Sequence, residues 1–265
     1  MLSILVGIAI DKGYLRLDQK LPELLPEAFD ENVDPLARAI TVRDLLTMTE
    51  GFDPAGAAAY ASKVGLPAGA MWRWMLNRMM KYPPGEHFFY DDVGANLLSV
   101  VLSRAINQDT ARFAQHYLFD PMQIVDYKWI SDAEGHLLGE TGLYLNARDM
   151  AKIGLLYLWR GRWSGKEIVS ESYVLDSTSK HNDGGPPVNA AYGYLWWINK
   201  TKTNLDAFFA AGFKSQLIYV VPKRELVAAV AADSIPGGSQ RFVNDIALPA
   251  SAKLAASTQC IARLH

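Results

Sequence analysis

The stretch MLSILVGIAIDKG (residues 1–13) decides the fold, because nine of its first ten residues are apolar or glycine. A helix that is apolar on every face is normally buried inside a larger body. The run stops at Asp11, well short of the roughly 20 apolar residues that a membrane span needs. It also lacks the positive start and the small-residue cleavage site of a signal peptide. We therefore predict a core helix over residues 1–12 that ends at Gly13.

The composition is that of a globular protein. Half of the 265 residues are hydrophobic and 20% are charged, with a formal net charge of −2. Lys and Arg are scattered without a basic run, so the sequence gives no reason to expect nucleic acid or a membrane surface as a partner. A single cysteine, Cys260, excludes an internal disulfide and leaves the compartment open.

Residues 1–165 are predicted to form a mainly helical lobe, and residues 166–265 an antiparallel sheet with a C-terminal helix, together as one structural domain. After the turn-rich connection 14–40, apolar periodicity and capping residues predict helices that begin at Thr41, at about residue 69, near Gly94, at Asp109 and after Asn146. The last of these is expected to stop at Gly161.

The second part contains short aromatic and β-branched runs that are typical of strands. SQLIYVVP (215–222) and ELVAAVAAD (225–233) predict an antiparallel hairpin, and a final helix is expected over about 238–256. The fold class is therefore α/β of the α+β kind. The three or four strands that this pattern predicts make a thin sheet for a chain of this length.

Five blocks, in order, carry a resemblance to a known family: ITVRDLLTMTEGF (40–52), PGEHFFYDD (84–92), TGLYLNARDMAKIGLLYL (141–158), YGYLWW (192–197) and AAGFKSQLIYVVP (210–222). The sequence resembles the serine β-lactamase and penicillin-binding-protein-like superfamily, in particular the branch of class C β-lactamases, esterases and 6-aminohexanoate-oligomer hydrolases. The resemblance implies a β-lactamase/transpeptidase-like fold. It also implies acyl transfer through a serine ester, with a Ser-x-x-Lys nucleophile, a proton-relay tyrosine and an oxyanion hole of two backbone N–H groups.

The relay tyrosine of this family corresponds to Tyr90, in the block PGEHFFYDD. Asp92 stands where the family usually has Asn or Ser, and a carboxylate cannot donate a hydrogen bond to a substrate carbonyl unless it is protonated. Without the resemblance, the sequence predicts that Tyr90 is a half-buried aromatic residue with its hydroxyl in water. Asp91 and Asp92 would then be the acids that favour a helix N-terminus.

The triplet Ala210-Ala211-Gly212 takes the place of the family's Lys/His-Thr-Gly strand motif. This leaves Gly212 and the backbone N–H of Phe213 as the expected oxyanion-hole residues. The missing cation at position 210 argues against a β-lactam carboxylate as substrate. Lys214 is expected either to replace that cation or to be an exposed residue at the hairpin edge.

Aromatic residues near the expected cleft could form a substrate wall, among them Trp196 and Tyr144. Adjacent residues in a strand point to opposite faces, so at least one of Trp196 and Trp197 is expected to belong to the core.

The nucleophile is missing from its expected place. The only Ser-x-x-Lys match, Ser177 to Lys180, lies downstream of Tyr90 in a polar connection and is interpreted as a chance match. Residues 1–13 correspond to the part of the family's helix directly after the catalytic lysine, with Ser3 as the last serine of that pattern. The nucleophile would then lie about five residues before Met1. The strands that precede it in the family would also be absent, and the exposed sheet edge could support self-association.

The expected function is therefore acyl transfer on a small-molecule ester, amide or β-lactam-like substrate by a serine hydrolase, with the chain as given expected to be inactive. The alternative is a non-catalytic binding protein that keeps the cleft, to which Asp92 and Ala210 lend support. The histidines lack metal-ligand spacing such as H-E-x-x-H, so neither a metal nor another cofactor is expected.

Overall fold

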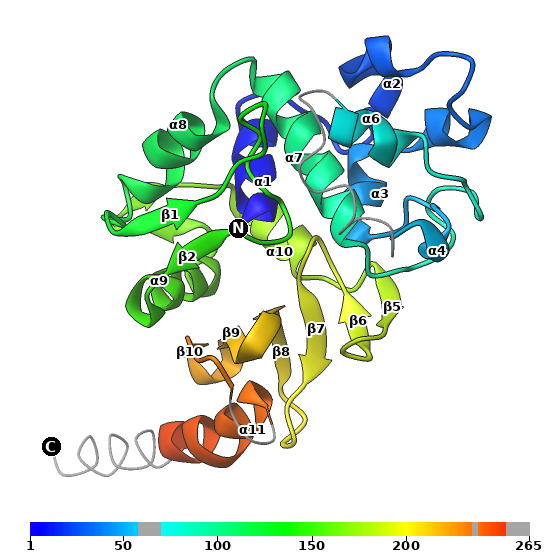
Figure 1. Ribbon diagram of the computed structural model, residues 1–265. Helices are drawn as coiled ribbons and strands as arrows, with labels where there is room; N and C mark the ends of the chain where they lie inside the picture. The colour runs from blue at the N-terminus through cyan, green and yellow to red at the C-terminus, as the bar shows by residue number, and fades with distance from the viewer. Residues whose placement is uncertain (58–69, 235–237, 253–265) are drawn as a thin grey trace, which may run out of the picture.

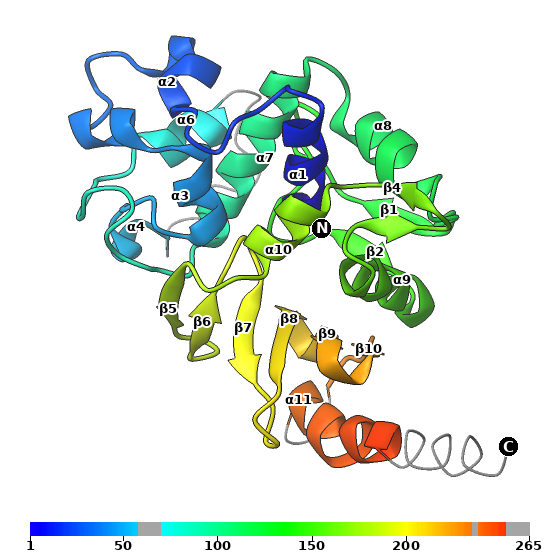
Figure 2. The same ribbon diagram turned by 180° about the vertical axis from the view of Figure 1, so that it is seen from behind.

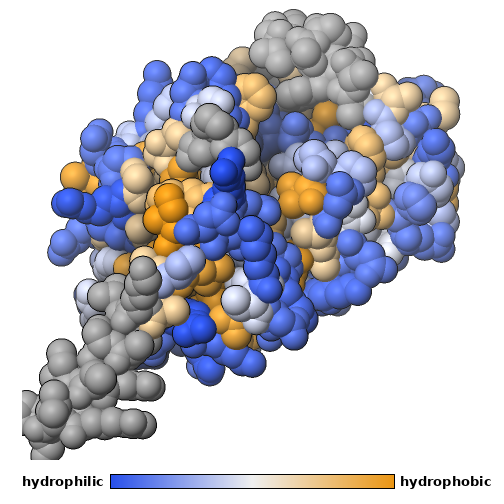
Figure 3. Space-filling model, turned by 90° about the horizontal axis from the view of Figure 1, so that it is seen from below, coloured by the Kyte–Doolittle hydropathy of each residue, from blue (hydrophilic) through white to orange (hydrophobic). Residues whose placement is uncertain are grey.

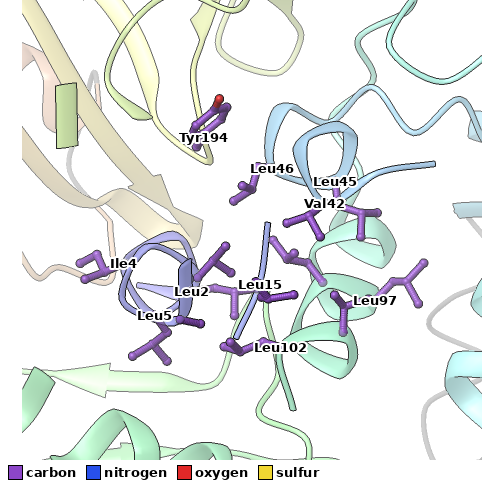
Figure 4. Close-up of a cluster of buried hydrophobic side chains, with 14 of the residues drawn as sticks. Leu2, Ile4, Leu5, Leu15, Val42, Leu45, Leu46, Leu97, Leu102 and Tyr194 are labelled. Carbon is purple, nitrogen blue, oxygen red and sulfur yellow. The ribbon is translucent and has the colours of Figure 1, made fainter. Parts of the chain in front are cut away.

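Helix α1 (Leu2–Asp11) lies at the centre of the molecule, between helices above and the sheet below (Figure 1). The computed structural model describes residues 1–57, 70–234 and 238–252. Eight consecutive residues of α1, from Leu2 to Ala9, are buried. Figure 4 shows Leu2 and Leu5 on α1 with Leu97 and Leu102 of a second helix among the apolar side chains of this cluster. The predicted core helix is confirmed, and it ends before Gly13, which has a φ of +76°.

The other helices lie around α1 and along the sheet (Figures 1 and 2). They are α2 (Leu21–Leu24), α3 (Val42–Thr47), α4 (Pro54–Ala57), α6 (Ala70–Leu76), α7 (Asp92–Ile106), α8 (Thr110–Ala114), α9 (Ala147–Leu158), α10 (Glu171–Ser177) and α11 (Ser239–Phe242). Short helical turns extend α8 over Gln115–Phe119 and α11 over Val243–Ala247. The final predicted helix is thus present from Ser239, and its last predicted residues lie outside the described part of the chain.

The N-caps follow the sequence prediction. Thr41 accepts a hydrogen bond from the N–H of Asp44 at the start of α3, and Asn146 accepts one from Asp149 at the start of α9. Helix α3 ends earlier than expected, at Met48, which has a φ of +55°. Gly51, where the helix was predicted to end, instead allows two backbone segments to lie close together: a Cβ at this position would lie 2.2 Å from the carbonyl oxygen of Tyr82.

The main sheet has six antiparallel strands in the order β10-β9-β8-β7-β6-β5. They are β5 (Asn182–Gly185), β6 (Ala190–Tyr192), β7 (Trp197–Lys200), β8 (Asp206–Gly212), β9 (Gln216–Val221) and β10 (Leu226–Val230). The expectation of three or four strands was wrong for two reasons: β5 has the sequence NDGG and carries no apolar alternation, and the aromatic run around residues 191–200 is divided between β6 and β7. The predicted hairpin is confirmed, with Leu226 opposite Val221.

Both faces of this sheet are buried. Phe208 and Ile218 belong to the apolar cluster that contains α1, whereas Phe209 and Tyr219 belong to a second cluster that includes Val243 after α11. Helix α9 packs against β9 and β10 on the first face. Side chains alternate along a strand, so one layer of strands separates two cores.

Two small hairpins complete the described fold. Strand β1 (Tyr127–Trp129) pairs with β2 (Leu143–Leu145), and β3 (Arg162–Trp163) pairs with β4 (Lys166–Glu167). In the described part of the chain no helix is both long and apolar enough to cross a bilayer.

Strand β10 forms one edge of the main sheet. Figure 3 shows a face of the molecule on which hydrophobic patches alternate with strongly hydrophilic areas. Self-association through the sheet edge stays a prediction.

The contact between α1 and α10 offers a test of how closely the buried helix is packed. A Cβ at Gly7 would lie 2.4 Å from the ring of Tyr173, whose hydroxyl donates to the carbonyl oxygen of Ser3. We expect Gly7→Ala to lower the free energy of unfolding by about 1–3 kcal/mol, because the ring cannot move away without losing that bond. Urea denaturation followed by circular dichroism measures the change.

Gly185→Ala is the matched control for this substitution. A Cβ at Gly185 would meet only Phe88, at 3.5 Å, which is an ordinary contact. Equal losses of stability in the two variants would contradict the close packing of α1 on α10.

Candidate active site

A cavity of about 220 Å³ lies where α1, α7 and the ends of two sheet strands meet. Met1 and Leu2 contribute from the start of α1, which Figure 1 shows between the helices and the sheet. Its remaining lining comes largely from four segments: Tyr90, Asp92 and Ala95; Gly139 and Glu140; Ala210, Ala211 and Gly212; and Gln216, Leu217 and Ile218. The structure therefore brings together the start of the first helix, the Tyr90 segment and the Ala210-Ala211-Gly212 triplet.

Two aromatic rings hold the side chain of Tyr90 in place. The Tyr90 ring stacks on Trp197 with centroids 5.5 Å apart and planes at 17°. Tyr192 meets Tyr90 edge-on at 6.4 Å and also lines the cavity. Aromatic pairs of this geometry fix ring orientation as well as burying area.

The protonation state of Tyr90 follows from its surroundings. Burial, and then the charges of Asp92 and Glu140, raise the pKa of Tyr90 to about 12. The phenol therefore stays protonated near neutral pH and can donate a hydrogen bond. To accept a proton it needs a nearby cation, which would lower its pKa.

Two acidic residues line the cavity. Asp92 lies in the first turn of α7, and burial, followed by the charge of Asp91, raises the pKa of Asp92 above its ordinary value. Glu140 precedes β2 and was missed by sequence reasoning; the one available clue is its place between Gly139 and Gly142. A Cβ at Gly139 would lie 2.1 Å from the carbonyl oxygen of Ala95, so this loop packs directly on the backbone of α7.

Gly212 ends strand β8 at the cavity and pairs with Gln216 of β9. A Cβ at Gly212 would lie 3.0 Å from the Cβ of Gln216, so the close approach favours glycine. The side chain of Phe213, the next residue, is 87% exposed. The oxyanion role of the Gly212–Phe213 backbone stays a prediction.

Three residues expected to bind substrate do not line the cavity. Trp196 is buried in the first core, 4.5 Å from the ring of Tyr157, and Tyr144 is exposed on β2. Lys214 Nζ lies 2.7 Å from Asp233 Oδ1 in an exposed ion pair. The geometry gives these expected roles no support, since each side chain is committed to another environment.

The Ser-x-x-Lys match does not form a nucleophile–base pair. Ser177 is completely buried and its hydroxyl donates to the carbonyl oxygen of Val174, whereas Lys180 is exposed and pairs with Asp183. Ser3 is also buried, with its hydroxyl 3.1 Å from that of Tyr173. Neither serine lines the cavity.

A buried ionic cluster lies directly behind Tyr90. Arg78 Nη1 and Asp91 Oδ2 are 2.5 Å apart, and both side chains are almost fully buried. Asp91 also caps α7 by accepting a hydrogen bond from the N–H of Val93. Glu50 completes the cluster, with one carboxylate oxygen in the space that a Cβ at Gly94 would fill. No motif predicts this cluster, because its members come from three separate segments.

Glu50 gives the protein a testable pH dependence. Burial, and then Asp91, raise the pKa of Glu50 well above its ordinary value of 4.5. The folded protein thus holds a proton that the unfolded chain releases, so this stability is complete below about pH 4.5 and is lost as the pH rises toward the folded-state pKa. We expect Glu50→Gln to remove this fall in folding stability with rising pH, because glutamine does not titrate. Relative to the unmodified protein, its free energy of unfolding should rise by about 1 kcal/mol or more between pH 5 and pH 8.

Urea denaturation at the two pH values measures this difference, with Glu31→Gln as a control at an exposed position. Parallel stability profiles for Glu50→Gln and the unmodified protein would show that Glu50 is ionised in the fold at both pH values.

Comparison with known proteins shows the family of this chain. The family model described as Beta-lactamase matches residues 1–250. An uncharacterised protein of Alkalihalophilus pseudofirmus is 21% identical over 273 residues, which cover 91% of this chain and 73% of that protein.

Solved structures have the same fold. The octameric penicillin-binding protein homologue of Pyrococcus abyssi is 20% identical, with a TM-score of 0.70, over 93% of this chain and 62% of its own. A Bacillus anthracis protein provisionally named a 6-aminohexanoate-dimer hydrolase is 18% identical, with a TM-score of 0.78, over 96% of this chain and 72% of its own. The chain thus spans less than two thirds of the Pyrococcus protein. The family model matches residues 1–250 of the 265-residue chain, and the fold combines helices with an antiparallel sheet. This chain therefore belongs to the beta-lactamase family.

Proposed function

We propose that this chain forms the greater part of a serine acyl hydrolase that cleaves small ester or amide substrates through an acyl-enzyme. The supporting observation is that one cavity joins the start of α1 to Tyr90 and to the Gly212 end of β8. In the proposed enzyme, a Ser-x-x-Lys segment before Met1 supplies the nucleophile and its base. The names of the Bacillus and Pyrococcus proteins fit such a reaction.

The proposed reaction has two steps. The serine oxygen attacks the substrate carbonyl, its proton passes through Lys and Tyr90 to the leaving amine or alcohol, and an ester forms on the enzyme. Water then attacks that ester, releases the acid and returns a proton to the serine. Backbone N–H groups near Gly212 stabilise the oxyanion in both steps.

The environment of Tyr90 is consistent with this role for a lysine. The carboxyl groups of Asp92 and Glu140 contribute to raising its pKa to about 12, and an ammonium group beside the phenol would lower that value toward neutral pH. Ala210 places no cation at the cavity to bind a β-lactam carboxylate, so esters and amides are the favoured substrates.

A catalytically inactive binding protein is the second candidate function. The observation that favours it is that no serine, threonine or cysteine is among the described residues that line the cavity. On this alternative, the cavity binds a ligand without cleaving it.

A fluorophosphonate probe, which reacts with activated serines, distinguishes the two functions. We expect no labelling of the 265-residue chain and rapid labelling of a protein extended by the upstream in-frame codons. In the extended protein, Tyr90→Phe should slow labelling by about 10²–10⁴-fold, because the proton relay is lost. Intact-protein mass spectrometry and peptide mapping give the rate and the site.

Tyr14→Phe is the control, since Tyr14 is partly exposed and packs edge-on against Phe113, away from the cavity lining. Labelling at Ser177 would contradict the proposal. A folded extended protein that is not labelled would favour the binding protein.

A further inference from the structure

We propose that Met48 and Leu195 determine the specificity of the cavity, because together they form an apolar wall that limits the length of an alkyl group bound there. Resting on the proposed function, the substrates then carry a short aliphatic group next to the cleaved bond. The observation behind this is the backbone conformation of the two residues. Met48 has a φ of +55° and Leu195 a φ of +58°, and both line the cavity.

A left-handed backbone is costly for a bulky apolar residue. It brings the Cβ close to the following carbonyl oxygen, so glycine and, less often, asparagine or aspartate occupy such positions. Every other described non-glycine residue with a positive φ has a polar or charged side chain. The two apolar exceptions, Met48 and Leu195, both lie at the cavity. Residues held in sparsely populated conformations cluster at functional sites, and we infer a function in ligand selection for these two.

Backbone hydrogen bonds hold the end of α3 in this conformation and join it to two other segments of the site. The N–H of Met48 donates to the carbonyl oxygen of Asp44, and the carbonyl oxygen of Met48 accepts from the N–H of Phe89 at 3.0 Å. The N–H of Leu195 donates to the carbonyl oxygen of Leu46 at 2.9 Å. The end of α3 is therefore tied both to the segment that carries the candidate relay tyrosine and to the turn between β6 and β7.

The turn that carries Leu195 is fixed in the same way. The N–H of Gly193 donates to the carbonyl oxygen of Trp196 at 2.8 Å, and the N–H of Tyr194 donates to that of Ser177 at 2.9 Å. A Cβ at Gly193 would lie 2.3 Å from the same oxygen of Ser177, so the turn packs directly on the end of α10. The backbone of Leu195 consequently has little freedom to move its side chain out of the cavity.

The packing of the two side chains explains why the wall sets a length limit. Met48 is 3% exposed and belongs to the second core, and Leu195 packs against both cores. Neither side chain carries a hydrogen-bond donor, so this wall favours an aliphatic group over a polar one. Burial of each methylene in an apolar site raises affinity about fourfold. We expect that gain to stop when the alkyl chain reaches the wall, because the cores behind it leave no room for the side chains to retreat.

The straight-chain alcohols from ethanol to n-octanol test this limit on the 265-residue chain. The ε-methyl group of Met150, labelled with ¹³C, lies in the cavity lining and reports binding by NMR. We expect the affinity to rise about fourfold for each added methylene up to a limiting chain length and not beyond it. In Leu195→Gly, which removes a four-carbon side chain from the wall, the limiting length should increase by at least about two methylenes.

A pair of variants at position 195 tests whether the left-handed backbone is retained. Leu195→Gly should unfold at a higher urea concentration than Leu195→Ala, because only glycine adopts this conformation without strain. Leu226→Gly and Leu226→Ala are the matched control pair, on strand β10 and outside the cavity lining. There the alanine variant should be the more stable one, and neither should change the limiting length. Met48→Gly is a second cavity variant should Leu195→Gly fail to fold.

Four results would overturn the inference: no binding of any alcohol to the unmodified chain, an unchanged limiting length in both cavity variants, an equal change in the Leu226 controls, or a higher stability of Leu195→Ala than of Leu195→Gly. These measurements do not involve serine labelling. Labelling of the extended protein without a change in limiting length removes this inference alone. A changed limiting length without labelling removes the hydrolase, and the two residues then select the ligand of a binding protein.

Discussion

The burial of α1 is the constraint on which the remainder of the structure depends. A ten-residue helix with eight buried residues can exist in water only if helices and sheet enclose it, and here α7, α10 and the first face of the sheet do so. The start of that helix is consequently held at the point where the Tyr90 segment meets the end of β8. The cavity thus forms where the segments that cover α1 meet those that cover the sheet.

The acidic residues near the start of α7 differ in their electrostatic surroundings. Asp91 is compensated by Arg78 and by the N-terminus of the helix, while burial and then the charge of Asp91 raise the pKa of Glu50 well above its ordinary value. Their neighbour Asp92 lines the cavity, and no arginine of the described part of the chain forms an ion pair with it. Two adjacent residues of the same type therefore have different roles, one in holding the helix start and the other in the charge of the site. Buried ion pairs of this kind stabilise little by themselves, but removal of one partner leaves the other charge uncompensated.

Much of this fold could be predicted from the sequence, because its strongest patterns are local. Thr41 and Asn146 cap helices, residues 1–10 are apolar or glycine apart from Ser3, and the hairpin around Pro222 is built from short runs rich in aliphatic and β-branched residues. Strand β5 could not be predicted, since its pairing depends on its neighbour and not on its own residues. The candidate site was likewise only partly predictable, because some of its residues are defined by contacts between distant segments. Tyr90 and Gly212 lie in recognisable blocks, whereas Glu140 and Arg78 acquire their roles only through contacts across the chain.

Trp196 and Trp197 show how sharply a single strand can divide a molecule. Trp196 packs with Tyr157 in the core around α1, while its neighbour Trp197 stacks on Tyr90 from the opposite face of the sheet. Trp197 is itself buried in the second core, so the residue that orients the Tyr90 ring also contributes to how firmly the chain folds. A substitution at position 197 is therefore expected to change fold stability and the shape of the candidate site together, whereas one at position 196 acts first on the core around α1.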